Sequence, residues 1–424
     1  MKIAVTRMGA LFHYSIPRTV QALGMLGRFY TDAWAGKPWG RALGAVPAGM
    51  RPDRLRRLLG RQTGEIPSGL VTDFPLLAIR YGMKRRGSRS VGEMIRAHLW
   101  AGEAFCRGII RHGMRGCDAV YTSNSQGLEL LRHAKGRGMR TMMEQTIAPY
   151  EYECGLLGRE QEKHPGWEVP RAEAGEAGRA FMEREREEWA LSDVIFCGSE
   201  FVRDGIGAVG GPVEKCRVVP YGFGFSGVRG VVKEVNRDRP LRVLFMGTVC
   251  LRKGMAEFVR VAEALRGRMT FRVVGPETLL PEAGARLRRS AEVPGPVPRA
   301  EVGGQYEWAD VFLFPSHCEG SATVCYEALA HGVPVICTPN TGSVVRDGVE
   351  GFIVEAGDVE AMVSRLERLD AGREELAALS AGALARRGYF GVEAYEGRLR
   401  EVLGRLDGGS SAWTGEMERG KERG

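Results

Sequence analysis

Residues 311–338 read VFLFPSHCEGSATVCYEALAHGVPVICT, and this stretch decides the fold. A short apolar run ends at Pro315, a loop carries Glu319 and Gly320, and a segment with helical periodicity follows. Gly332 ends that helix, because glycine readily adopts the backbone conformation that closes a helix, and a second apolar run follows it. A strand, a helix and another strand in this order predict a βαβ unit of a parallel sheet.

The same alternation recurs along the whole chain. In the first half, apolar runs predict strands at residues 2–6, 117–122, 140–143 and 193–197. In the second half, they predict strands at residues 241–247, 270–275, 311–315, 334–338 and 351–355. The fold class is therefore α/β, with two Rossmann-like doubly wound domains that we expect to face each other across a ligand-binding cleft.

Loss of periodicity and a gain of glycine and charge over residues 223–240 mark a linker between the two domains. A last helical pattern is long enough to cross back to the first domain. The polar, glycine-rich tail is expected to be flexible. The predicted divisions are a first domain over 1–222, the linker over 223–240, a second domain over 241–390, a crossover helix over 391–406 and the tail over 407–424.

Composition places the chain among ordinary globular proteins and excludes several classes. It has 424 residues, 44% hydrophobic and 26% charged, with a net charge of +8. The nine cysteines form no C-x-x-C pair, so neither a zinc site nor a disulfide framework is predicted. No apolar run spans a bilayer, and Met1-Lys2 leads directly into an apolar strand without a signal-peptide pattern. We expect a cytoplasmic protein that does not bind nucleic acid.

The loop and helix after Pro315 predict an anion site. The first turn of the helix would present the unpaired backbone N–H groups of Thr323 and Val324 at the positive end of the helix dipole. Glu319 and Glu327 flank this turn, and their carboxylates could hold the hydroxyls of a sugar ring and of a ribose. The alternative is that both carboxylates merely complement the dipole, which stabilises a helix by about 0.3–1 kcal/mol.

A second element repeats the pattern at residues 245–254, FMGTVCLRKG, where a strand end and a glycine turn precede a helix. Lys253 could neutralise a departing diphosphate there, and Arg252 stands next to it. The alternative is that Lys253 is simply solvated.

These segments resemble the donor-binding signature of the retaining nucleotide-sugar glycosyltransferases of family 4, which have the GT-B fold. The match is Glu319-Gly320, followed by residues 327–335, EALAHGVPV, and by Lys253 in register. The resemblance implies catalytic roles for Glu319 and Lys253, an acceptor-binding first domain and a donor-binding second domain. The implied donor-binding residues are Gly247, Thr248, Arg252, Gly320, Ser321, Thr323, Val324, Glu327 and, in the loop over the nucleotide base, Val297.

The implied reaction transfers a hexose from a nucleoside diphosphate sugar to an acceptor hydroxyl with retention, without a metal or another cofactor. The acceptor would be a glycan, a lipid-linked sugar or a small molecule, as in cell-envelope polysaccharide biosynthesis. The family often has arginine where this chain has Thr248, and a first-domain histidine that has no secure match here. The acceptor-side candidates are His13, Asn124, Glu144 and Gln145.

Basic, partly amphipathic stretches at residues 51–61 and 84–89 suggest peripheral contact with an anionic membrane, or else a solvated helical face. Other functions stay open. A catalytically silent binding protein would explain Thr248 and the missing histidine. A sugar-nucleotide epimerase or a glycan phosphorylase would use the same architecture, the latter with pyridoxal phosphate on a buried lysine.

Overall fold

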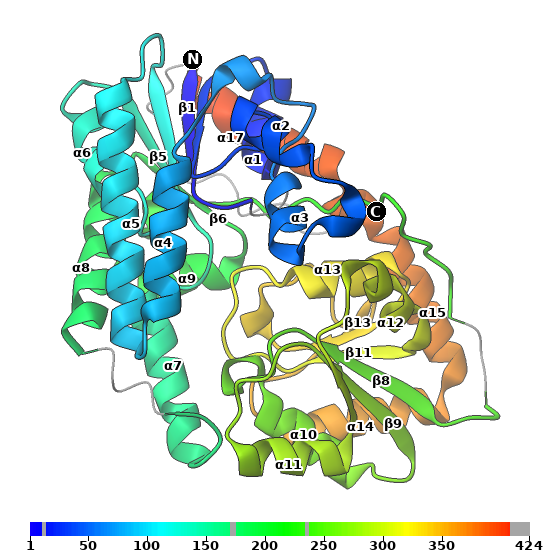
Figure 1. The fold of residues 1–424 in the computed structure, drawn as a ribbon. Helices are drawn as coiled ribbons and strands as arrows, with labels where there is room; N and C mark the ends of the chain where they lie inside the picture. Colours follow the sequence, from blue (N-terminus) through cyan, green and yellow to red (C-terminus); the bar gives the residue numbers. More distant parts are fainter. Residues whose placement is uncertain (11–13, 170–174, 234–236, 408–424) are drawn as a thin grey trace.

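The computed structural model describes residues 1–10, 14–169, 175–233 and 237–407, which form two α/β domains (Figure 1). Each domain is built on one sheet whose neighbouring strands pair in parallel. This arrangement confirms the predicted fold class. His13 and the tail beyond residue 407 lie outside the described residues.

The first domain has a seven-stranded sheet in the order β3-β2-β1-β4-β5-β6-β7. Its strands are β1 (Ile3–Arg7), β2 (Leu26–Thr31), β3 (Val71–Asp73), β4 (Ala119–Ser123), β5 (Arg140–Gln145), β6 (Val194–Cys197) and β7 (Cys216–Val218). The helices are α1 (Ser15–Ala22), α2 (Pro38–Gly44), α3 (Asp53–Leu59), α4 (Pro75–Gly87), α5 (Val91–His112), α6 (Leu128–Lys135), α7 (Tyr150–Lys163), α8 (Gly175–Leu191) and α9 (Glu200–Ala208).

Both faces of this sheet are buried because successive strand residues point to opposite sides. In β1, Ile3 and Val5 join one hydrophobic cluster, whereas Ala4 joins another on the opposite face. The second cluster includes Phe105 of α5 and Leu130 of α6. Figure 1 shows α4, α5, α6 and α8 together on that side of the sheet.

The second domain has a six-stranded sheet in the order β10-β9-β8-β11-β12-β13. Its strands are β8 (Leu241–Met246), β9 (Met269–Val274), β10 (Glu292–Gly295), β11 (Val311–Phe314), β12 (Val335–Cys337) and β13 (Gly351–Ile353). The helices are α10 (Met255–Ala264), α11 (Pro281–Ser290), α12 (Val302–Trp308), α13 (Thr323–Ala330), α14 (Val359–Ala371), α15 (Arg373–Ala385) and α16 (Arg387–Phe390).

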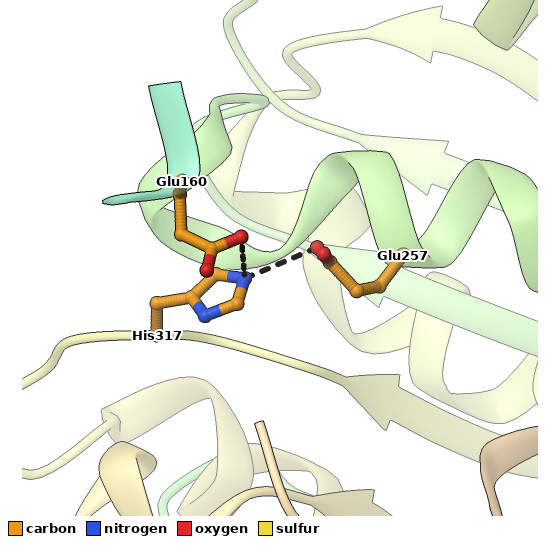
Figure 2. Close-up of side chains that lie close together, drawn as sticks. All are labelled: Glu160, Glu257 and His317. Carbon is orange, nitrogen blue, oxygen red and sulfur yellow. Dashed lines mark hydrogen bonds and ion pairs between the residues drawn. The ribbon is translucent and has the colours of Figure 1, made fainter. Parts of the chain in front are cut away.

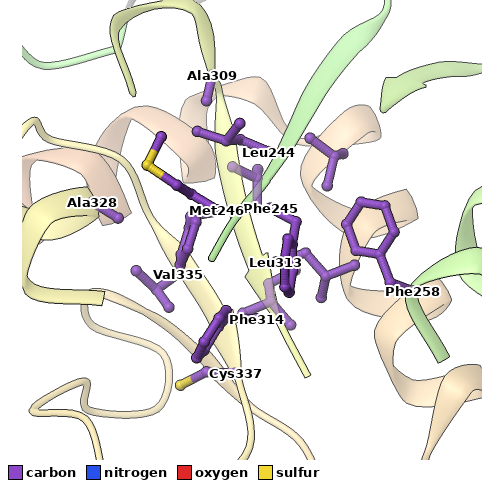
Figure 3. Close-up of a cluster of buried hydrophobic side chains, with 14 of the residues drawn as sticks. Leu244, Phe245, Met246, Phe258, Ala309, Leu313, Phe314, Ala328, Val335 and Cys337 are labelled. Carbon is purple, nitrogen blue, oxygen red and sulfur yellow. The ribbon is translucent and has the colours of Figure 1, made fainter. Parts of the chain in front are cut away.

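Strands β8 and β11 form the centre of this domain's core (Figure 3). The rings of Phe245 and Phe314 stack with their centroids 5.5 Å apart, and Phe258 of α10 packs edge-on against Phe245. The two strands are direct neighbours, so the loops that follow them leave the sheet side by side.

Helix α17 (Val392–Asp407) crosses back to the first domain, as the fold prediction requires. Tyr395, Leu399 and Leu403 recur at helical spacing and join the same cluster as Ile3 and Val5. The segment before β8 packs on the second domain, where the backbone N–H of Phe223 donates to the Phe390 carbonyl at 2.8 Å. The two domains are thus connected by two crossings of the chain.

Several elements of the first domain were not predicted from the sequence. Among them are strands β2 and β3 and helices α5 and α7. Strand β2 contains Gly27 and Arg28, which interrupt the apolar run, and β3 has only three residues. In the second domain, residues 293–299 were expected to form the loop over the nucleotide base, but the first three of them belong to β10, which pairs with β9.

Candidate functional site

Two cations and one carboxylate meet where β8 and β11 end. The Lys253 Nζ lies 2.6 Å from Oε1 of Glu319, and an Arg252 guanidinium nitrogen lies 3.1 Å from the same oxygen. The hydroxyl of Ser316 also donates to that oxygen at 3.1 Å. The structure therefore brings together the two predicted catalytic residues and places Arg252 beside them.

The backbone before α10 holds the cations in place. Residues Leu251–Lys253 form a single 3-10 turn, and Gly254 follows with φ of 71°, a left-handed conformation that favours glycine. A β-carbon at Gly254 would lie 2.0 Å from the carbonyl oxygen of Pro315. Glycine at this position thus lets the turn pack directly against the start of the Glu319 loop.

Burial and charge oppose each other at Glu319. Burial alone would raise the pKa of this carboxyl, but the positive charges of Arg252 and Lys253 outweigh it, so the pKa lies below the ordinary value. Burial disfavours the charged form of Arg252, yet Glu319 and Glu153 raise its pKa. The group is therefore an ionised cluster in which Arg252 lies between two carboxylates, since its Nε is also 3.9 Å from Oε1 of Glu153.

Glu327 lies in α13, where Thr323 and Val324 form the first turn. Its carboxylate accepts a hydrogen bond from the Tyr306 hydroxyl at 3.0 Å and from Arg299 at 3.3 Å. Burial, followed by the charge of Glu327, raises the pKa of Tyr306 well above its ordinary value, so this hydroxyl stays a donor. Tyr306 and Arg299 were not among the predicted site residues.

The remaining donor-side candidates lie around the same strand ends. Gly247 follows β8 with φ of 145°, and a β-carbon there would lie 3.4 Å from the Lys253 side chain. Thr248 is partly exposed, and Val297 packs partly buried against the domain core. Ser321 is buried and bonded internally, to the Tyr326 hydroxyl at 2.6 Å and to the Gly342 carbonyl at 3.1 Å.

Gly320 is where the donor-side loop touches the first domain. A β-carbon at this position would lie 1.9 Å from the Thr146 carbonyl oxygen, which follows β5. The Ser199 hydroxyl, which caps α9 by accepting from the Val202 N–H, also donates to the Gly320 carbonyl. The carboxyl ends of the two sheets therefore meet at this loop.

The acceptor-side candidates that the structure describes are buried in the first domain. Glu144 forms a buried ion pair with Arg7. Asn124 and Gln145 both donate to Oε1 of Glu185, at 3.4 and 2.8 Å. Burial raises the pKa of Glu185 to about 7, although these donors oppose it. The predicted binding roles of Asn124, Glu144 and Gln145 stay predictions.

The second half of the chain is similar in sequence to known glycosyltransferases. Residues 240–371 match the family model of the Glycosyl transferases group 1. A D-inositol 3-phosphate glycosyltransferase of Xylanimonas cellulosilytica is 34% identical over 176 residues, which are 39% of this chain and 42% of that protein. The amylovoran biosynthesis glycosyltransferase AmsK of Erwinia amylovora is 26% identical over 216 residues, 47% of this chain and 53% of AmsK. The chain thus spans about half, or less, of the length of these curated relatives.

Solved structures extend the similarity to the whole fold. The crystal structure of Anabaena HepE in complex with UDP superposes with a TM-score of 0.59 at 13% identity, and covers 96% of this chain and 100% of HepE. The GT-B fold is therefore confirmed, as is the glycosyltransferase character of the second domain. The assignment to family 4 stays a prediction.

Proposed function

We propose that this protein is a glycosyltransferase that moves a hexose from a nucleoside diphosphate sugar to an acceptor hydroxyl with retention of configuration. The observation that carries the proposal is the convergence of Lys253 and Arg252 on Glu319, within a domain that matches the group 1 glycosyl transferases. The UDP in the HepE complex supports a uridine nucleotide as the first donor to test.

Each charged group has a part in this reaction. The diphosphate would accept hydrogen bonds from the backbone N–H groups in the first turn of α13. The positive charges of Lys253 and Arg252 would offset its negative charge, which stabilises the leaving group without a metal ion. Glu319 would then be released to hold hydroxyls of the transferred sugar. Glu327, fixed by Tyr306, would hold the ribose.

The transfer step needs no strong base from the first domain. The bond between the anomeric carbon and the phosphate oxygen breaks, and the acceptor oxygen forms its bond on the same face of the sugar. The acceptor proton passes to the leaving phosphate oxygen, which balances the step. Lys253 and Arg252 stabilise the negative charge that develops on the phosphate.

The test is donor turnover by the purified full chain. Incubation with a panel of nucleotide sugars that includes UDP-glucose should release nucleoside diphosphate from one of them, slowly with water and faster with an acceptor. Lys253→Met should lower kcat by about 100–1,000-fold, as loss of one donor to a developing charge does elsewhere. Lys233→Met removes a partly buried lysine that donates to the Tyr306 and Glu307 carbonyls instead, and should retain more activity. Absence of both binding and hydrolysis across the panel would refute the proposal.

We also propose that the acceptor is lipid-linked or a glycan made at a membrane surface, on the cytoplasmic face. No helix among the described residues is long and apolar enough to cross a bilayer, so contact would be peripheral. Helix α4 supports this contact, because Leu76, Ile79 and Met83 follow one face and are 70%, 59% and 66% exposed. Lys84, Arg85 and Arg86 in its last turn would attract anionic lipids.

A further inference from the structure

A buried cluster of ligand-type side chains lies between the domains, apart from the charges around Glu319. Glu160 comes from α7 of the first domain, Glu257 from α10 of the second, and His317 from the loop after β11. Figure 2 shows both carboxylates pointing at the same imidazole nitrogen. Nε2 of His317 lies 3.1 Å from Oε2 of Glu257 and 3.4 Å from Oε2 of Glu160.

The hydrogen bonds of the cluster do not satisfy all of its atoms. Glu160 is only 5% exposed, and its Oε2 has no hydrogen-bond partner within the described part of the chain. Nε2 of His317 can carry at most one hydrogen and lies within hydrogen-bond distance of Glu257, and Lys163 donates to the other oxygen of Glu160 at 2.7 Å. A buried carboxylate oxygen that makes no hydrogen bond lowers the stability of the fold, unless another group binds to it.

The two distances from Nε2 of His317 fit a bound metal ion. A tetrahedral ion with N and O ligands at about 2.0–2.2 Å holds those ligand atoms about 3.3–3.6 Å apart, close to both distances from Nε2. The ligand atoms of the three residues all lie within 4.8 Å of one another. His164 adds an outer contact, since its Nε2 lies 3.3 Å from Oε1 of Glu257 and would orient that carboxylate.

We propose that Glu160, Glu257 and His317 bind a divalent transition-metal ion, with Zn²⁺ as the best fit. An imidazole ligand favours Zn²⁺ over Mg²⁺ or Ca²⁺, which prefer oxygen alone. The ion replaces the proton on Nε2 of His317 and gives Oε2 of Glu160 its missing partner. It ties α7 of the first domain to α10 of the second, and its fourth position is left for water.

This proposal is independent of the proposed transfer reaction, because none of the three ligands is a residue that we assign to the donor. The competing explanation is a metal-free interdomain ion pair in which His317 is protonated between two carboxylates. The two explanations differ in metal content, because only the first requires bound Zn²⁺ at neutral pH.

The test uses the untagged full chain, stripped with EDTA, reloaded with Zn²⁺ and desalted. We expect about one Zn²⁺ per chain, a higher Tm with Zn²⁺ than without it, and a change in the fluorescence of Trp167, whose ring packs against His164. Glu160→Gln and His317→Gln should each abolish the stoichiometric Zn²⁺. His164→Gln should weaken binding by about 10–100-fold, as loss of an outer-shell partner does.

His98→Gln is the control, since His98 is partly buried and bonds to Ser125 and Tyr81 in the first domain, away from the cluster, and this variant should keep the metal. The absorption spectrum of the wild-type chain loaded with Co²⁺ tests the ligands without a variant. Co²⁺ bound by nitrogen and oxygen should show d–d bands and no thiolate charge-transfer band. A wild-type chain that retains no Zn²⁺, Zn²⁺ retained equally by Glu160→Gln and His317→Gln, or a thiolate band would each overturn the proposal.

Discussion

The charge balance around Glu319 makes a quantitative prediction about stability. At an effective dielectric constant of about 20, a pair 2.6 Å apart attracts with about 6 kcal/mol before desolvation is subtracted, and the Arg252 pair at 3.1 Å attracts with about 5 kcal/mol. Because either cation alone can compensate the carboxylate, Lys253→Met or Arg252→Met should each lower the free energy of unfolding by only about 1–2 kcal/mol.

Removing both cations leaves the buried Glu319 carboxylate uncompensated, which costs about 3–5 kcal/mol beyond ordinary packing losses. The double variant should therefore lose about 1–3 kcal/mol more than the sum of the single variants. The assay is urea unfolding at pH 7 of the wild type, the two single variants and the double variant, which form a double-mutant cycle. Arg252→Met also removes the hydrogen bond from Arg252 to the Cys318 carbonyl, but this loss occurs in both the single and the double variant and therefore cancels.

The pH dependence gives the cycle an independent check. In the wild type the pKa of Glu319 is lowered, so its contribution to stability is present above the unfolded pKa and is lost as the pH falls through the folded pKa. In the double variant, only the hydrogen bond from Ser316 still opposes burial, so the pKa of Glu319 should rise. The stability gap between wild type and double variant should thus narrow from pH 7 to pH 5. Additive losses with a gap that does not change with pH would refute the charge-balance argument.

The remaining predictions concern the loop, the ribose carboxylate and the exposed helix. Gly320→Ala should force the loop away from the Thr146 carbonyl and lower the free energy of unfolding by about 1–3 kcal/mol, measured by urea unfolding. It should also raise the KM for the donor in steady-state kinetics, and an unchanged KM would contradict the close contact. Tyr306→Phe removes the hydrogen bond to Glu327 and should weaken nucleotide binding, measured by calorimetry, by about 5–10-fold. An unchanged affinity would contradict the proposal that Glu327 binds the ribose. Replacing Leu76, Ile79 and Met83 together by Gln should abolish co-sedimentation with phosphatidylglycerol vesicles, and Val213→Gln, at another exposed position, should leave it intact; retained binding by the triple variant would exclude α4 as the contact.

The sequence could predict the second domain because local patterns determine it. The run at Val311–Phe314 is apolar throughout, as expected for a strand buried on both faces. Lys253 and Glu319 could be placed together because each follows the carboxyl end of a strand in a doubly wound sheet.

The first domain was less predictable because its elements depend on contacts between residues that are distant in the chain. Strand β2 forms because it pairs with β1 on one side and β3 on the other, although it contains Arg28. No local sequence pattern indicates this pairing. Glu160, Glu257 and His317 lie far apart in the chain, so no ligand spacing could reveal them. The contact of Gly320 with Thr146 likewise depends on how the domains meet.

One loop connects these separate observations. The segment after β11 presents Glu319 to the two cations, Gly320 to the Thr146 carbonyl and His317 to the carboxylates of α7 and α10. Neighbouring residues of an extended loop point in different directions, so the donor-side charges and both interdomain contacts share one short backbone. Within the second domain, this loop is bonded to the turn before α10, through the His317 N–H to the Arg252 carbonyl at 2.8 Å and through Glu319 to Lys253. The contacts of His317 with Glu160 and of Gly320 with Thr146 therefore place the first domain directly beside the backbone that presents the donor-site charges.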